Sequence, residues 1–208
     1  MKKLILLSII FVNLAFGYNY NDLLLKAQAS IFPKIMLLDK NIKNKLINGK
    51  IIYTIVYEQT DYDVALKIMH LINTKYNGHI NKYEIKINLV PFSELSKNID
   101  TTAIYVLNTD ISIQKVIHIA SIKNIITFSY DINNLKKGLL FSLVIEKSTV
   151  LYLNKENLYT RKIDFPDSLL QMVHFVDTHT VEGESSLNFD DTSLVQMYTQ
   201  YFTTKEIY

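Results

Sequence analysis

The 208-residue sequence contains no cysteine, only five glycines and a single arginine, Arg161. The absence of cysteine excludes disulfide bonds, a thiol nucleophile and a lipid-modified cysteine anchor. With so few glycines, the chain has no G-x-G-x-x-G or Walker A spacing, and so no recognisable phosphate-cradling loop. Nucleic-acid recognition relies on bidentate arginine forks, so we expect no nucleic-acid partner.

Catalytic and metal-binding patterns are also scarce. The chain has no G-x-S-x-G nucleophile elbow and no H-E-x-x-H pair. His174, Asp177 and His179 have a spacing that could contribute metal ligands, but we favour a solvated helix end, where an imidazole suits the helix dipole. Asp61 and Asp63 resemble paired carboxylates and are more simply caps of the following helix. We therefore predict no enzyme activity, no metal site and no cofactor.

The composition is that of an ordinary folded domain. Hydrophobic residues make up 49% of the chain and charged residues 20%, which is enough apolar surface for a buried core. The formal charge is +2, and Lys2 and Lys3 account for both charges. A mature chain without these two lysines would carry no net formal charge.

Residues 1–17 have the three parts of a secretory signal peptide. A basic start at Lys2-Lys3 precedes an apolar run over 4–14, and small residues at Ala15 and Gly17 provide a cleavage site. The alternative is a membrane anchor, but the run is shorter than the roughly 20 residues that a spanning helix needs. We predict a soluble periplasmic protein that begins near Tyr18.

The middle of the chain alternates between strand and helix patterns. Residues 139–145 and 149–153 are strand-like and close enough for a hairpin. Four earlier apolar runs, rich in β-branched and aromatic residues and separated by helical segments, predict strands over 51–57, 83–90, 103–107 and 125–128. This order predicts an α/β fold, namely a three-layer sandwich with a mostly parallel sheet and an antiparallel edge hairpin.

Helical patterns flank these strands. We expect Asn77-Gly78 to stop the helix that follows residues 51–57, and Ser129 and Asp131 to cap the turn after residues 125–128. Residues 20–38 predict an opening helix that Pro33 can break or kink, and residues 165–176 predict a closing amphipathic helix. We expect one α/β domain over 18–177, followed by a polar C-terminal tail over 178–208. Within the tail the composition indicates a loose linker, 178–192, and a weak helix, 193–202.

Several short motifs occur in the order typical of one family of exported bacterial regulators. The segment ITFSYDINNLKKG combines a strand, Ser129, Asp131, a short helix and Gly138. The strand TVLYLN ends in Asn154, and DSLLQMV resembles a closing Ser-x-Leu-Leu helix. Over residues 20 to 176 the chain therefore resembles the YfiR/HmsC-like family. It lacks the paired cysteines of some members, and Lys137-Gly138 stands where paired glycines are common.

The resemblance implies a periplasmic α/β protein without catalysis. Family members restrain a membrane-anchored diguanylate cyclase by binding its periplasmic sensor portion, which lowers cyclic di-GMP and biofilm formation, and relatives serve as sensory input domains. We therefore expect the partner to be a membrane signalling protein, either a diguanylate cyclase or a sensor kinase. A small-molecule ligand and a homodimer are further candidates.

Two other functions stay open. One is a periplasmic small-molecule-binding protein that serves a transporter or sensor kinase, and the other is a hydrolase with a histidine and a carboxylate in a cleft. In α/β sheets, ligands bind beyond the carboxyl ends of the strands. The residues predicted for a ligand or partner surface are those at these ends, namely Tyr57, Glu58, Asn108, Ser129, Tyr130 and Asp131.

Overall fold

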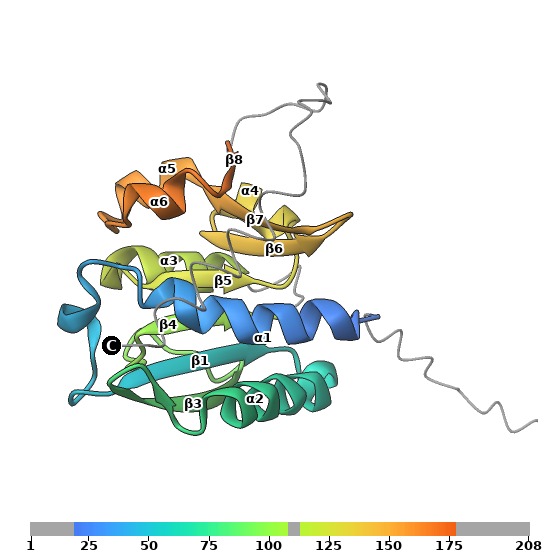
Figure 1. Cartoon of the computed structure of the whole chain (residues 1–208). Coiled ribbons are helices and arrows are strands. Elements are labelled where there is room, and N and C mark those ends of the chain that lie inside the picture. Colours follow the sequence, from blue (N-terminus) through green and yellow to red (C-terminus); the bar gives the residue numbers. More distant parts are fainter. Residues whose placement is uncertain (1–18, 108–112, 178–208) are drawn as a thin grey trace, which may run out of the picture.

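The computed structural model of the protein describes residues 19–107 and 113–177, which form one α/β body (Figure 1). Its centre is an eight-stranded sheet in the order β2-β3-β1-β4-β5-β6-β7-β8. The strands are β1 (Ile51–Tyr57), β2 (His79–Ile80), β3 (Tyr83–Pro91), β4 (Ala103–Val106), β5 (Ile126–Ser129), β6 (Phe141–Ile145), β7 (Thr149–Asn154) and β8 (His174–Val176). The signal peptide, Asn108 and the tail over 178–208, with its expected linker and helix, lie outside the described residues.

Helices cover the sheet on both faces. The α-helices are α1 (Asp22–Met36), α2 (Tyr62–Tyr76), α3 (Ile113–Lys123), α4 (Asn133–Lys137), α5 (Lys155–Thr160) and α6 (Asp167–Leu170). Two short 3-10 helices, η1 (Ile42–Lys45) and η2 (Gln59–Asp61), precede β1 and α2. Within the described residues, no helix is both long and apolar enough to cross a bilayer.

The sheet confirms the predicted fold class. Strands β3, β1, β4, β5 and β6 are parallel neighbours, as expected for buried apolar runs joined by helical crossovers. The predicted hairpin is β6-β7, which pairs antiparallel from Phe141 opposite Leu153 to Ile145 opposite Thr149. It lies one strand in from the edge, because β8 pairs parallel with β7.

One face of the sheet is packed with aromatic side chains beneath α1 and α2. Phe32 of α1 stacks on Phe128 of β5, with ring centroids 4.6 Å apart, and also meets Tyr105 of β4 edge-on at 5.5 Å. Phe128 in turn stacks on Phe141 of β6 at 5.7 Å. Because strand side chains alternate between faces, these residues on four elements form one continuous core.

The opposite face is covered by α3 and is smaller. Val116 and Ile119 of α3 pack against Ile104 and Val106 of β4. Buried polar side chains beside this cluster are satisfied internally, as in the 2.8 Å hydrogen bond from the Thr54 hydroxyl to the Thr101 hydroxyl. The two faces therefore give the three-layer arrangement that the sequence predicts.

Local signals explain where the helices begin and end. The Asn21 side chain accepts hydrogen bonds from the first-turn N–H groups of α1. Pro33 does not break this helix, which continues to Met36. The predicted stop of α2 is confirmed at Asn77, whose left-handed backbone (φ 48°) ends the helix. Asp131 accepts a 2.9 Å hydrogen bond from the Asn133 N–H and so supports the turn before α4, as predicted.

Two local predictions are wrong. Residues 165–176 do not form one helix, because α6 covers only Asp167–Leu170 and the chain then extends into β8. The edge of β7 that faces away from β6 has backbone N–H and C=O groups that need partners. Residues 174–176 bind to them as β8, which a helix could not do. Asp61 occupies the cap position of α2, but its side chain makes no capping hydrogen bond. The Asp61 carboxylate accepts a hydrogen bond from the Tyr20 hydroxyl instead.

Candidate functional site

The strand order reverses direction at β1. The chain leaves β1 into α2 on one face, returns as β3 on one side of β1, and then crosses to β4 on the other side. The connection from β4 to β5 then runs through α3 on the opposite face. In open α/β sheets ligands bind at such a switch point, beyond the carboxyl ends of the strands.

The structure brings five of the predicted site residues to this end of the sheet. Tyr57 ends β1 and Glu58 follows it. Ser129 ends β5, and Tyr130 and Asp131 follow it. The sixth, Asn108, lies outside the described residues. The backbone ties these ends together, because the Tyr130 N–H donates to a β4 carbonyl at 2.9 Å.

Three of these residues are buried and form the base of this end of the sheet. The exposed fractions of Tyr57, Ser129 and Tyr130 are 5%, 0% and 6%. Burial is the main reason why the pKa values of Tyr57 and Tyr130 lie above the ordinary value, so both phenols are protonated at neutral pH. Glu58 and Asp131 are half-buried and retain contact with solvent.

The start of α1 closes over this base. The Tyr20 ring meets the Tyr130 ring edge-on with centroids 4.7 Å apart, and the Tyr20 hydroxyl donates to an Asp61 carboxylate oxygen at 2.7 Å. The backbone N–H of Asn21 donates to the Tyr130 hydroxyl at 2.8 Å. These contacts hold the N-terminal ends of α1 and α2 beside each other.

Two large apolar side chains are exposed above the closed base. Leu23, in the first turn of α1, is 66% exposed, and Tyr62, in the first turn of α2, is 42% exposed. The Tyr62 ring also contacts the buried Tyr57 ring, with centroids 5.7 Å apart. We call the surface formed by Tyr20, Leu23, Tyr57, Tyr62 and Tyr130 the tyrosine edge.

The sequence did not single out Tyr20, Leu23 or Tyr62 for this surface. Each is an ordinary apolar or aromatic position near a helix start when taken alone. Their common location depends on α1 lying next to α2, which no local pattern specifies. The one available signal was Asp61, whose predicted cap role pointed to the correct end of α2.

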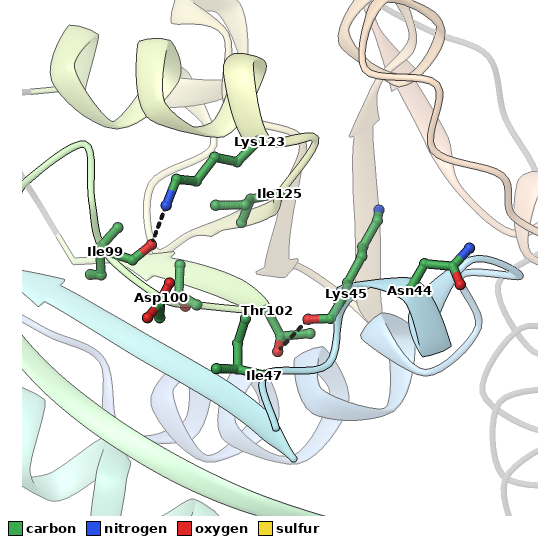
Figure 2. Close-up of a pocket in the computed structure, with 9 residues that line it drawn as sticks. Asn44, Lys45, Ile47, Ile99, Asp100, Thr102, Lys123 and Ile125 are labelled. Carbon is green, nitrogen blue, oxygen red and sulfur yellow. Dashed lines mark hydrogen bonds between the residues drawn. The ribbon is translucent and has the colours of Figure 1, made fainter. Parts of the chain in front are cut away.

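A separate pocket of about 180 Å³ lies at the opposite, amino ends of the strands (Figure 2). Its polar groups are mostly bonded within the protein. The Thr102 hydroxyl donates to the Lys45 carbonyl at 3.1 Å, and the Lys123 ammonium donates to the Ile99 carbonyl at 2.6 Å (Figure 2). The Lys45 ammonium forms an ion pair with the buried Asp39 at 2.5 Å. We infer that this pocket has a structural role, because few of its hydrogen-bond donors are left to bind a ligand.

The weak metal pattern at the C-terminal end does not form a site within the described residues. His174 lies in β8, and its ring packs edge-on against Tyr152 with centroids 5.5 Å apart. His179 lies outside the described residues. Across 19–107 and 113–177, no group of three or more histidine, aspartate and glutamate side chains could hold a metal ion.

Known proteins give little guidance to function. No protein-family model matches the chain, and no curated protein matches its sequence. A solved ABC domain in complex with L-Trp from Streptococcus pneumonia is 12% identical with a TM-score of 0.45, covering 68% of this chain and 61% of that one. A conserved domain protein from Vibrio cholerae O1 biovar El Tor is 14% identical with a TM-score of 0.49, covering 66% and 60%.

A third similar structure is a ligand-free, open substrate-binding protein with adhesive properties from Clostridium difficile. It is 13% identical with a TM-score of 0.47, and the match covers 66% of this chain and 58% of that one. The chain thus spans about three fifths of the length of these proteins. All three TM-scores are below 0.5, so their ligands carry no weight for this chain.

Proposed function

We propose that the mature protein is a non-catalytic periplasmic regulator. It binds the periplasmic part of a membrane-anchored diguanylate cyclase or sensor kinase, and thereby affects cyclic di-GMP signalling and biofilm formation. The signal-peptide pattern over 1–17 supports export. The ordered motifs between residues 20 and 176, which resemble the YfiR/HmsC-like family, support the choice of partner.

The observation that best supports partner binding is the tyrosine edge. Leu23 and Tyr62 expose apolar surface on a base that Tyr20 and Tyr130 hold in place. Protein interfaces are enriched in tyrosine, because its ring buries a large area while its hydroxyl finds a polar partner. Both side chains sit on helices, so little conformational entropy is lost when a partner covers them.

The tyrosine edge can be tested by charge substitution in cells. The gene is deleted from its natural host and restored as wild type, as Leu23→Glu/Tyr62→Glu, or as the control Ile122→Glu. Ile122 is a matched control because it is 63% exposed and lies on α3, on the other face of the sheet. We expect wild type and control to restore the cyclic di-GMP level, and the double variant to fail.

Direct binding gives a second measurement. Wild-type and variant mature chains are immobilised, and captured membrane proteins are identified by mass spectrometry. A cyclase or sensor kinase retained by wild type and by Ile122→Glu, but not by the double variant, is the expected result. An unchanged cyclic di-GMP level in the deletion strain, together with no captured cyclase or kinase, would overturn the proposal.

A small-molecule-binding protein that serves a transporter or sensor kinase is the second candidate. The observation in its favour is the reversal of strand order beside Tyr57, where open α/β sheets bind ligands. Native mass spectrometry of the purified mature chain, followed by thermal melting with amino acids, sugars and nucleosides in turn, tests it. Stabilisation by one compound class would favour this function over binding a protein partner alone.

A further inference from the structure

A basic groove runs between α1 and α2, away from the tyrosine edge's closed base. It has a volume of about 340 Å³. Figure 1 shows the two helices side by side along this length. The residues that line it come from both helices, and they are Lys26, Ala29, Ser30, His70, Leu71, Thr74 and Lys75.

Two contacts between the helices fix the width of the groove. Near one end, the Lys67 ammonium forms an ion pair with Asp22 at 2.6 Å. Near the other, the Tyr76 hydroxyl donates to the Ser30 carbonyl at 2.5 Å. The helices therefore run parallel, and with a rise of about 1.5 Å per residue the two contacts lie about 12 Å apart along the axes. The packing of the two helices therefore forms the groove between these contacts.

The positive charges in the groove are not neutralised by the protein. In the described part of the chain, no carboxylate lies within 4.0 Å of the Lys26 or Lys75 ammonium. No acidic residue lines the groove. Asp22 is one turn from Lys26. Its pKa is lowered chiefly by the hydrogen bond from Lys67 and in smaller part by the charge of Lys26, so Lys26 is attracted to Asp22 without forming an ion pair with it. This contrasts with the amino-end pocket, where the lysines donate to protein acceptors.

Two polar side chains and an apolar floor complete the groove. The His70 Nε2 and Thr74 Oγ1 atoms are 3.4 Å apart, so both polar groups gather on one side of α2. Ala29 and Leu71 supply the apolar part of the lining. Small-molecule sites combine an apolar lining with a few convergent polar groups in this way.

We propose that this groove binds a small organic anion through a carboxylate or phosphate group. The anionic group lies between Lys26 and Lys75 and accepts hydrogen bonds from the His70 and Thr74 side chains. A short apolar body packs on Ala29 and Leu71. This site is separate from the tyrosine edge, so it stands or falls independently of the proposed regulator function.

The test uses isotope-labelled mature chain and NMR titration with inorganic phosphate and, separately, succinate. We expect saturable shifts of the amide signals of His70, Leu71 and Thr74. In Lys26→Gln/Lys75→Gln the affinity falls by about tenfold or more, because charge-assisted hydrogen bonds are the strong ones. The control Lys86→Gln/Lys97→Gln removes two exposed lysines elsewhere and keeps wild-type affinity.

A second arm separates free anions from lipid headgroups. Vesicles of phosphatidylglycerol are sedimented with each variant, and neutral phosphatidylcholine vesicles serve as the reference. Sedimentation lost only in Lys26→Gln/Lys75→Gln would identify the headgroup as the source of the anion. Shifts that do not saturate, or that are the same in this variant and in wild type, would overturn the proposal. Both variants should retain the wild-type melting temperature, because all four lysines are exposed.

Discussion

Arg161 offers the sharpest test of how this fold is stabilised. The only arginine of the chain is 1% exposed, and among the described residues no carboxylate pairs with it. Its guanidinium donates to the Gly138 carbonyl at 2.5 Å and to the Thr127 hydroxyl at 2.9 Å. Its Nε has no hydrogen-bond partner in the described structure. Burial lowers the pKa of its guanidinium to about 10, so it remains charged at neutral pH.

The cost of burying the Arg161 charge and the gain from its hydrogen bonds can be compared as free energies. The lowering of the Arg161 pKa to about 10 corresponds to a burial penalty of about 3 kcal/mol, at about 1.4 kcal/mol per pKa unit. Two hydrogen bonds from a charged donor contribute about 3 to 6 kcal/mol together. Replacement by methionine removes both terms and also leaves the buried Gly138 carbonyl without its donor, which costs about 1–3 kcal/mol. Together these terms predict that Arg161→Met lowers the free energy of unfolding by about 1–6 kcal/mol.

Arg161→Lys is the companion variant. An ammonium is more strongly hydrated than a guanidinium and cannot reach two acceptors in the same fork geometry, so we expect a larger loss than for methionine. The assay is urea unfolding of the mature chain, followed by circular dichroism at neutral pH. A methionine variant as stable as wild type, or a lysine variant without loss, would refute this account of the Arg161 contacts.

The dependence on pH provides an independent check on Arg161. Because its pKa is lower in the folded state, the folded protein releases the proton first as the pH rises through about 10. The burial penalty is therefore fully present below that pH and is relieved above it. Wild type should gain stability relative to Arg161→Met at alkaline pH, since tyrosine ionisation affects both proteins equally. A difference that stays constant with pH would contradict the assigned pKa shift.

Two further predictions concern alkaline unfolding and a glycine. Burial raises the pKa of Tyr53, Tyr76 and Tyr105, so the unfolded chain ionises these phenols first and stability falls above a pH of about 10. The part of the tyrosinate absorbance that comes from these buried phenols should appear together with loss of circular dichroism, and ionisation of all tyrosines with the fold intact would contradict this. Gly138→Ala should destabilise by about 1–2 kcal/mol, because alanine is strained at φ 123° and its Cβ would lie 3.2 Å from an α3 side chain. Gly49→Ala, with φ 78° but nothing within 4 Å, measures the backbone strain alone, and equal losses in thermal melting would rule out the contact.

Much of the fold could be predicted because its strands are continuous apolar runs. Residues 51–57 and 103–107 are too hydrophobic for a half-exposed strand, and they form the buried centre of the parallel sheet. The stop of α2 at Asn77 and the turn at Asp131 depend on neighbouring residues only, and both predictions are confirmed. The sequence was sufficient to predict the local structure wherever the interacting residues are close together in the chain.

The errors arose where distant parts of the chain decide the structure. The apolar positions Leu169, Leu170 and Val173 fit a helical period, but the free edge of β7 draws the following residues into β8. Tyr57 and Tyr130 were expected at a surface, but both are buried. The start of α1 covers Tyr130, and Tyr62 of α2 contacts Tyr57. The groove beside Lys26 was not visible at all, since it exists only because α1 and α2 run parallel with a particular stagger.

The anchoring of Tyr20 and Asn21 has a practical consequence for handling the protein. Any peptide fused directly ahead of these residues would emerge next to Leu23 and Tyr62 and would shield them from a partner. Residue 177, by contrast, follows β8 on the outer flank of the sheet. A fluorophore attached at residue 177 would therefore sit beside β8 and leave Leu23 and Tyr62 uncovered.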